Sequence, residues 1–269
     1  MFLLYRASGE LEDYRIYLGL ATSKDGFHFK RISEEPVFSP SEDGFDAGCV
    51  EDPRIVKFND TFYITYAARA FPPGAFWKGK RRESLPKQTR TWVENLTRSG
   101  LVKSKDLRHF ERVGPITGDD IDDRDVILFP EKIRGKYVML HRPMQWVGKK
   151  YGCEQPSIWI AYSEDLLHWG DDHLVAQPVW GWESSKIGGS TPPIKTEDGW
   201  LTLYHGVDKN SIYRVGLMLL DLMNPDKILA RAPEYILEPE EIFEKEGIVN
   251  NVVSVSYTHL RAHETSLHL

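Results

Sequence analysis

Short apolar and aromatic runs alternate with turn residues along this chain, a pattern typical of antiparallel strand pairs. The pattern predicts hairpins of residues 54–58 with 62–66, 126–133 with 137–140, and 192–195 with 200–204. The predicted turns are Asn59-Asp60, Arg134-Gly135 and Glu197-Asp198-Gly199. Residues 2–6 match the second strand of an earlier copy.

A second pattern follows the strand pairs: a strand, a Ser-x-Asp turn and a short aromatic strand. It recurs at 19–29, 100–110 and 160–169. Hairpin and second pattern together make four strands, and repeats of four short strands indicate a β-propeller. The predicted fold class is therefore all-β.

Two segments depart from the repeat. Residues 70–97, with Pro, Lys, Arg and Trp but no clean period, match a long loop, a usual place for binding determinants. Residues 239–246 fit one or two acidic helical turns.

Composition narrows the function classes. The chain has 269 residues, a formal charge of −6, and 8 Trp, 12 Tyr and 12 Phe. A large core is expected, and a general nucleic-acid binder is disfavoured because it would normally carry a basic surface. No apolar run reaches the about 18 residues of a membrane span, and the N-terminal apolar stretch is too short for a secretion signal. With only Cys49 and Cys153, no disulfide framework is evident and the cytoplasm is the expected location.

The candidate catalytic and binding residues lie at the open ends of the predicted hairpins. The start of a hairpin's first strand and the end of its second share the end opposite the turn. This places ionisable residues of several hairpins at equivalent ends: Arg6, Asp52, Arg124, Arg142, Lys186 and His205. If the hairpins are radial blades, these groups gather at one mouth of the channel.

Charge then suggests a reaction. Glycoside hydrolysis needs two carboxylates, whereas Asp52 stands out here among cations. Arginine forks and lysine suit phosphate, and phosphate needs no base because it is already deprotonated. The set favours phosphorolysis, with inorganic phosphate as co-substrate and no cofactor. We find no convincing metal-ligand spacing.

Each residue also has an ordinary structural interpretation. Asp52 lies in a common Asp-Pro-Arg turn, and Arg124 could pair with a neighbouring aspartate. Arg142 could simply end a strand, His205 could be a satisfied core histidine, and Lys186 could be solvated. Other carboxylates stay open as a second acid: Glu51, Asp125, Glu131 and Asp208.

The motifs resemble those of glycoside hydrolase family 130. They are Gly48-Cys49-Val50-Glu51-Asp52-Pro53-Arg54-Ile55, Asp123-Arg124-Asp125-Val126, Phe129-Pro130-Glu131-Lys132, His141-Arg142-Pro143, Pro192-Pro193-Ile194-Lys195 and Tyr204-His205-Gly206-Val207. The resemblance implies a five-bladed β-propeller. It also implies an inverting phosphorylase of β-mannosides, or one of the family's β-1,2-mannosidases.

By this resemblance Asp52 is the general acid and protonates the glycosidic oxygen through the mannose 3-hydroxyl. The implied phosphate ligands are Arg124, Arg142, Lys186 and His205. Arg6 and Tyr213 match sugar-contacting positions. In the 70–97 loop, Phe76, Trp77 and Trp92 could stack on an acceptor sugar, or could simply pin the loop.

The ends differ from the family pattern. A leading strand is expected before Met1, and a last blade beyond Val253. We therefore expect residues 1–253 to be a β-propeller catalytic domain, truncated in its first and last blades. Residues 254–269, with histidines at 259, 263 and 268, match a non-native tail better than a metal-binding tract.

The sequence thus predicts a cytoplasmic glycoside phosphorylase that converts β-mannosides to α-mannose 1-phosphate. The linkage (β-1,2 or β-1,4), the acceptor and homo-oligomer formation stay open. A β-mannosidase and a non-catalytic carbohydrate-binding propeller are the alternatives. The expected partners are a β-mannoside oligosaccharide and phosphate, without nucleic acid or membrane.

Overall fold

The structure is a computed structural model that describes residues 1–8, 13–246 and 249–253. Its contacts divide the chain into two compact units. Unit 1 contains the described residues up to Arg124, and unit 2 begins at Asp125. Within the described ranges, no helix is long and apolar enough to cross a bilayer.

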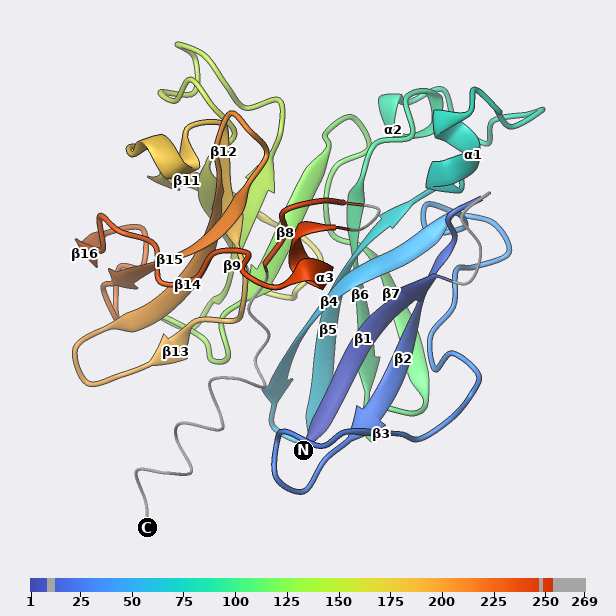
Figure 1. The fold of residues 1–269 in the computed structure, drawn as a ribbon, viewed down its shortest axis with the longest axis horizontal. Helices are drawn as coiled ribbons and strands as arrows, with labels where there is room; N and C mark the ends of the chain where they lie inside the picture. Colours follow the sequence, from blue (N-terminus) through green and yellow to red (C-terminus); the bar gives the residue numbers. More distant parts are fainter. Residues whose placement is uncertain (9–12, 247–248, 254–269) are drawn as a thin grey trace. The chain divides into compact units, whose positions relative to one another are not determined.

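Unit 1 contains two antiparallel sheets of sequential strands (Figure 1). The first has three strands: β1 (Phe2–Ser8), β2 (Ile16–Thr22) and β3 (Lys30–Arg31). The second has four: β4 (Cys49–Phe58), β5 (Thr61–Arg69), β6 (Arg98–Ser104) and β7 (Phe110–Pro115). A shared apolar core that includes Leu18, Val50 and Ile64, each fully buried, lies between them.

Unit 2 repeats the plan. One sheet has β8 (Asp123–Leu128), β9 (Tyr137–Pro143), β10 (Ile158–Ser163) and β11 (Gly170–Ala176). The next has β12 (Lys186–Gly189), β13 (Ile194–Lys195), β14 (Trp200–Val207), β15 (Tyr213–Leu220) and β16 (Ile228–Arg231). Trp200, Tyr204 and Phe129 are fully buried in this unit's core.

The predicted all-β class is confirmed, and sheets of successive antiparallel strands are the blades of a mainly-β propeller. Among the described residues the first sheet has three strands, and the predicted truncation of this blade stays a prediction. Helices are short: α1 (Pro73–Trp77) and α2 (Arg90–Val93) in the predicted loop, the 3-10 turn η1 (Gly181–Glu183), and α3 (Ile242–Lys245) in the predicted acidic turn. The described residues 249–253 contain no strand, and the tail at 254–269 lies outside the described residues.

The third predicted hairpin forms, but its first strand is only the two-residue β13, in which Ile194 pairs with Leu201 and Lys195 with Trp200. The rest of that edge of β14 pairs with β12, a strand that the sequence pattern did not predict. The sequence pattern does not indicate β12 because two of its four residues are Gly188 and Gly189, and glycine is normally depleted in strands. A Cβ at Gly188 would lie 2.1 Å from an oxygen of Asp125, so close packing requires glycine there.

The second predicted hairpin is also too long, since β8 ends at Leu128 rather than Ile133. Pro130 has no amide hydrogen to continue the ladder. Beyond it, Ile133 forms a separate bridge with Lys136.

The Ser-x-Asp turns form as predicted, and they explain why the strand predicted at 27–29 is absent. Oδ1 of Asp25 accepts hydrogen bonds from the backbone amides of Phe27 and His28, at 2.9 and 2.8 Å. Those amides are unavailable to a strand, so β3 begins only at Lys30. These bonds, with the His28 side chain, lower the pKa of the Asp25 carboxyl.

Candidate active site

A β-bulge at the head of β4 presents Asp52. The register with β5 shifts between Glu51 and Arg54, and Asp52 has a φ of 52°, in the left-handed region. The Arg54 guanidinium donates a 2.7 Å hydrogen bond to the Asp52 carbonyl and supports this backbone. The Asp52 side chain is 40% exposed. Strained bulges beside functional sites aim a side chain out of the ladder, and here that side chain is the predicted acid.

Arg6 of β1 binds both carboxylates at this bulge. Its Nη1 lies 2.8 Å from Asp52 and 3.0 Å from Glu51. Burial opposes the charge on Arg6, but the two carboxylates outweigh it and raise the pKa of the guanidinium. Burial, followed by the charge of Asp52, raises the pKa of Glu51. The predicted proximity of Arg6 and Asp52 is present in unit 1.

Two aromatic rings adjoin this group. The Arg6 guanidinium donates a 3.2 Å hydrogen bond to the Tyr14 hydroxyl. The Tyr14 ring packs against Trp77 of α1 with centroids 5.5 Å apart. Trp77 is 64% exposed, so an apolar surface faces solvent beside the acid group. Nothing in the sequence pattern indicated Tyr14, because its link to Arg6 depends on tertiary packing.

The other aromatics of the 70–97 segment hold it in place. Trp92 is buried, with the Arg82 guanidinium 5.1 Å from its ring centroid. The Arg81 guanidinium lies 3.9 Å from the Phe76 ring centroid. For these two rings the structural interpretation fits, whereas Trp77 keeps a surface that a sugar can contact.

Arg124 lies in β8 but is the last described residue of unit 1, because the boundary between the units falls within this strand. Its guanidinium donates two hydrogen bonds to the Asp122 carboxylate, at 2.5 and 2.7 Å. The side chain is one-third exposed. Its positive charge favours the ionised form of Glu51. Arg124 therefore does form an ion pair, with Asp122, and its predicted role as a phosphate ligand stays a prediction.

Unit 2 gathers three of the predicted residues and one further carboxylate. Arg142, at the end of β9, donates a 2.7 Å hydrogen bond from Nε to Asp125, and its Nη2 lies 2.6 Å from the same oxygen. Nε2 of His205 in β14 lies 3.6 Å from this oxygen. All three side chains are nearly buried. Lys186 is brought alongside because β12 pairs with β14, with Gly188 opposite His205.

Tyr213 completes this cluster. The Lys186 ammonium lies 5.2 Å from the Tyr213 ring centroid, and the His205 ring packs against Tyr213 at 5.6 Å. Arg142 and His205 thus lie against Asp125, and Lys186 is joined to them through Tyr213 and the pairing of β12 with β14. Such a group can hold an anion, because a guanidinium fork and an ammonium outnumber the acid.

The sequence offered Asp125 as a possible second acid or as an ion-pair partner of the neighbouring Arg124. In the structure it orders the cations instead. Its place next to a predicted apolar strand gave a weak signal, but its pairing with a residue 17 positions later is a tertiary property. That all the predicted site residues meet at one channel mouth stays a prediction.

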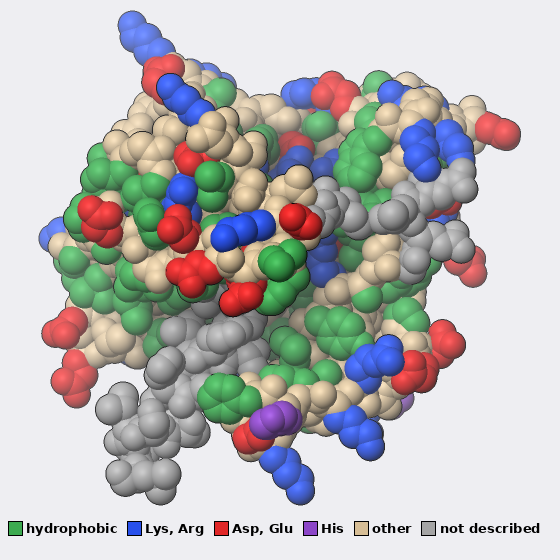
Figure 2. Space-filling view, viewed as in Figure 1, with side chains coloured by type: hydrophobic (Ala, Val, Ile, Leu, Met, Phe, Trp, Pro, Cys, Tyr) green, Lys and Arg blue, Asp and Glu red, His purple; other side chains and the backbone are tan. Residues whose placement is uncertain are grey.

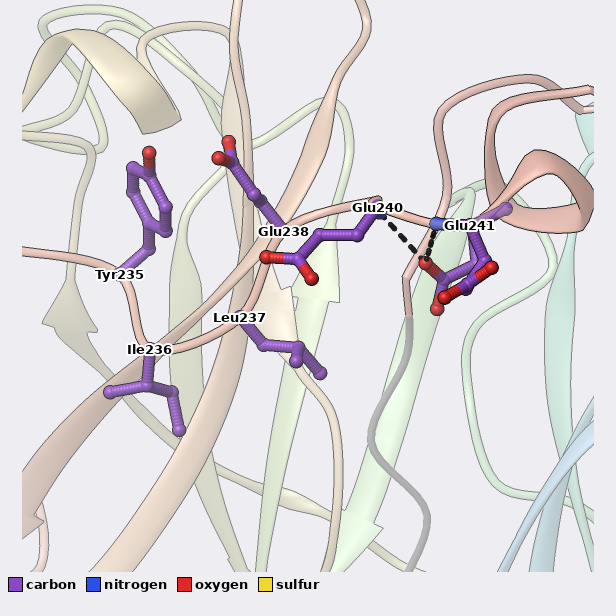
Figure 3. Close-up of a pocket in the computed structure, with 7 residues that line it drawn as sticks. Tyr235, Ile236, Leu237, Glu238, Glu240 and Glu241 are labelled. Carbon is purple, nitrogen blue, oxygen red and sulfur yellow. Dashed lines mark hydrogen bonds between the residues drawn. The ribbon is translucent and has the colours of Figure 1, made fainter.

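A surface hollow elsewhere in unit 2 has different chemistry. It has a volume of about 270 Å³ and is lined by Tyr235, Ile236, Leu237, Glu238, Glu240, Glu241 and Glu244 (Figure 3). Four carboxylates make it unsuited to phosphate.

On the face drawn in Figure 2, acidic and basic side chains are interspersed rather than gathered into one basic surface. Within the described chain, no cluster of three or more His, Cys, Asp or Glu suits a metal ion.

The chain is thus a mainly-β propeller with an exposed aspartate at a strained bulge in one unit and a cation cluster around a buried aspartate in the other. Residues 1–266 match a family model described as beta-1,4-mannooligosaccharide phosphorylase of glycoside hydrolase family 130. The chain belongs to this family and is one of its glycoside phosphorylases.

Individual relatives agree. The chain is 41% identical to a 1,2-beta-oligomannan phosphorylase of Thermoanaerobacter sp. (strain X514), over 93% of this chain and 75% of the relative. It is 29% identical to a beta-1,4-mannooligosaccharide phosphorylase of Ruminococcus albus, over 93% of this chain and 67% of the relative. A solved beta-1,2-mannobiose phosphorylase of Listeria innocua, in complex with beta-1,2-mannobiose, matches with a TM-score of 0.72. That match has 30% identity and covers 94% of this chain and 73% of the other.

Proposed function

We propose that this chain catalyses inverting phosphorolysis of β-mannosides. A phosphate oxygen attacks the anomeric carbon of the terminal mannosyl residue, and the bond to the glycosidic oxygen breaks. That oxygen leaves with a proton, and α-mannose 1-phosphate forms. The observation that carries this proposal is the cluster of Arg142 and His205 against the nearly buried Asp125, with Lys186 joined to it through Tyr213.

Asp52 is the proposed proton donor, since its side chain is exposed at a strained bulge and oriented by Arg6. General acid catalysis contributes about 10²–10⁴-fold to such reactions. Phosphate arrives as an anion, so no second carboxylate is needed to deprotonate it. The cations position phosphate and offset its charge, with Arg124 as a further proposed ligand.

For the linkage, we propose β-1,2-linked oligomannosides as the first choice. The relative with the oligomannan name is 41% identical and the solved mannobiose phosphorylase is 30% identical. The Ruminococcus relative that acts on β-1,4 linkages is 29% identical, and the matching family model also carries a β-1,4 description. Identity therefore favours β-1,2 only moderately, and both substrates belong in the test.

Arg6, Tyr213 and Trp77 are the proposed sugar contacts. Trp77 offers a solvent-facing ring of the kind that sugars stack on, and Tyr213 lies over Lys186 in the proposed phosphate cluster.

We further propose the family's five-bladed propeller as the full architecture. Two buried free cysteines support a cytoplasmic location.

The test is incubation with β-1,2- and β-1,4-mannooligosaccharides, with and without phosphate, followed by ³¹P NMR. Phosphate-dependent appearance of α-mannose 1-phosphate supports the proposal. Release of free mannose at a rate indifferent to phosphate would identify a mannosidase. Sugar binding without turnover, unchanged in Asp52→Asn, would identify a carbohydrate-binding propeller.

Arg142→Lys tests the proposed phosphate site itself. Lysine keeps the charge but loses the fork, so KM for phosphate should rise about tenfold. The KM for the mannoside should change little. Equal changes in both constants would argue against a phosphate-specific role for Arg142.

A further inference from the structure

A buried carboxylate joins three parts of the second sheet in unit 1. Asp46, which precedes β4, is 2% exposed. Its Oδ2 accepts a 2.9 Å hydrogen bond from the Tyr66 hydroxyl of β5 and another of 2.9 Å from Arg112 Nε of β7. Its Oδ1 accepts a hydrogen bond from the Ser41 hydroxyl. The segment entering β4 is thus tied to the second and fourth strands of its own sheet.

Unit 2 contains the same device. Glu183, in η1 before β12, is fully buried. It accepts a 3.0 Å hydrogen bond from the Tyr204 hydroxyl of β14 and bonds of 2.9 Å to each oxygen from Arg231 Nη2 of β16. Arg231 Nε also donates a 3.1 Å hydrogen bond to the Tyr204 hydroxyl. Again the carboxylate precedes the first strand, the tyrosine lies in the next strand, and the arginine lies in the last.

The surrounding packing repeats as well. An aromatic residue directly precedes each carboxylate, Phe45 in one case and Trp182 in the other, and each contacts the tyrosine ring. Each tyrosine also lies over a glycine of the neighbouring strand. A Cβ at Gly100 or Gly216 would lie 2.5 or 2.6 Å from the tyrosine Cζ. The two sheets have little local sequence in common, yet both place a buried carboxylate, a tyrosine and an arginine in the same arrangement.

The clamped tyrosines stand beside the proposed site. Tyr66 lies in β5 between Thr65 and Ala67, which pair with Arg54 and Glu51, so it faces the bulge that carries Asp52. Tyr204 pairs with Gly189 of β12 and directly precedes His205. Burial and the adjacent carboxylate raise the pKa of Tyr66, so its hydroxyl stays a hydrogen-bond donor.

We propose that these two carboxylate–tyrosine–arginine clamps are positioning devices: Asp46–Tyr66–Arg112 fixes the bulge of Asp52, and Glu183–Tyr204–Arg231 fixes the backbone that carries His205 and Lys186. This inference rests on the proposed function for its kinetic consequences but not for its structural ones. In this proposal the clamp residues hold the site segments rather than contact substrate, which agrees with the burial of Asp46, Tyr66, Glu183 and Tyr204.

The test removes one hydroxyl from each clamp. Tyr66→Phe and Tyr204→Phe keep the ring over its glycine and delete only the donor to the carboxylate. In hydrogen exchange, Tyr66→Phe should speed exchange of the amides around Glu51–Arg54 about tenfold, because a hydrogen bond to a charged group is lost. Tyr204→Phe should do the same around Lys186–Gly189. Each variant should leave the other unit's segment unchanged.

Ser104→Ala and Ser163→Ala are matched controls. Each removes a hydroxyl from a Ser-x-Asp turn in the same unit as one clamp, where the hydroxyl accepts backbone hydrogen bonds. Ser104 pairs with Phe62, near the closed end of the β4–β5 hairpin. These variants should lose stability without faster exchange at 51–54 or 186–189. Equal exchange in clamp and control variants would overturn the inference.

Kinetics give the second readout. Tyr66→Phe should lower kcat about tenfold with little change in KM for phosphate, since it loosens the acid. Tyr204→Phe should raise KM for phosphate by a similar factor. If both variants change both constants alike, the clamps are merely structural. If the parent protein shows no phosphorolysis, the proposed function fails, while hydrogen exchange still decides the inference.

Discussion

The heads of β4 and β8 carry aspartates in the same unusual backbone conformation with opposite surroundings. Asp52 has a φ of 52° and Asp125 a φ of 53°. The Asp52 side chain is 40% exposed and pairs with Arg6 in unit 1, whereas Asp125 is 10% exposed and pairs with Arg142 in unit 2. An exposed acid can give its proton to a substrate, while a buried one compensates the charge of its neighbours. The comparison shows that a repeat can reuse a backbone position and change its chemistry by burial.

The strongest test of this difference is to replace Asp52 and Asp125 each by asparagine. Asparagine tolerates the left-handed backbone conformation, so only the charge is removed. Asp52→Asn should lower kcat about 10³-fold by removing the acid. The free energy of unfolding should change by less than about 1 kcal/mol, since the Arg6 pair is partly exposed. Steady-state kinetics and urea unfolding measure the two effects. Activity within tenfold of the parent would remove Asp52 from the acid role.

Asp125→Asn should instead destabilise the protein. Arg142 would be left buried without its charge partner, at a cost of about 2–4 kcal/mol. Phosphate should then raise the melting temperature of this variant more than that of the parent, because it supplies the missing negative charge. Thermal melts with phosphate and with chloride of equal ionic strength measure this. A phosphate effect no larger than in the parent would contradict the proposed anion site.

Trp77→Ala tests whether the exposed ring near Asp52 contacts the sugar chain. Loss of an exposed stacking ring costs about 0.5–1.5 kcal/mol, so KM for longer mannooligosaccharides should rise about two- to tenfold. The KM for phosphate should not change. Val93→Ala is the matched control, since Val93 is an exposed apolar residue of the same 70–97 segment. A similar rise in the control would mean that the segment, rather than the ring, matters.

Glu51→Gln should have the smallest effect and a distinctive pH dependence. Burial and Asp52 raise the pKa of Glu51 above its ordinary value of 4.5. The protonated form therefore stabilises the folded protein below that pH, and this contribution is lost as pH rises through the folded-state pKa.

Glutamine imitates the protonated form, so the variant should be more stable than the parent above pH 4.5 and equal below it. The expected gain in the free energy of unfolding is the smallest of these effects. Urea unfolding from pH 4 to pH 8 measures it. Glu94→Gln is the control, and it should lower stability at neutral pH rather than raise it. Arg90 holds the pKa of Glu94 below its ordinary value, so the ionised form is the one that stabilises the folded protein. A pH-independent difference at Glu51 would contradict the assigned cause.

The hairpins and Ser-x-Asp turns were predictable because local patterns specify them. Alternating apolar residues and turn residues predicted β4–β5, and Asp25 forms the expected turn. β12 was missed, since Gly188 and Gly189 carry no strand signal. Glycine is required there by the packing of Asp125 and Ile127, which are distant in sequence. The clamps left only a faint trace, an aromatic-acid pair before the first strand of two sheets.

The sequence by itself determined the all-β class, the four-strand repeat and the identities of the charged residues at the strand heads. These follow from periodicity and residue type, which are local properties. Tertiary structure decided which carboxylate is exposed and which is buried, because burial depends on strands brought together from far along the chain. It also decided that Tyr14 adjoins Arg6 and that Arg142 binds Asp125. The environment of each aspartate, exposed for Asp52 and nearly buried for Asp125, was therefore decided by its neighbours in space, since solvent access and charge pairing depend on tertiary packing.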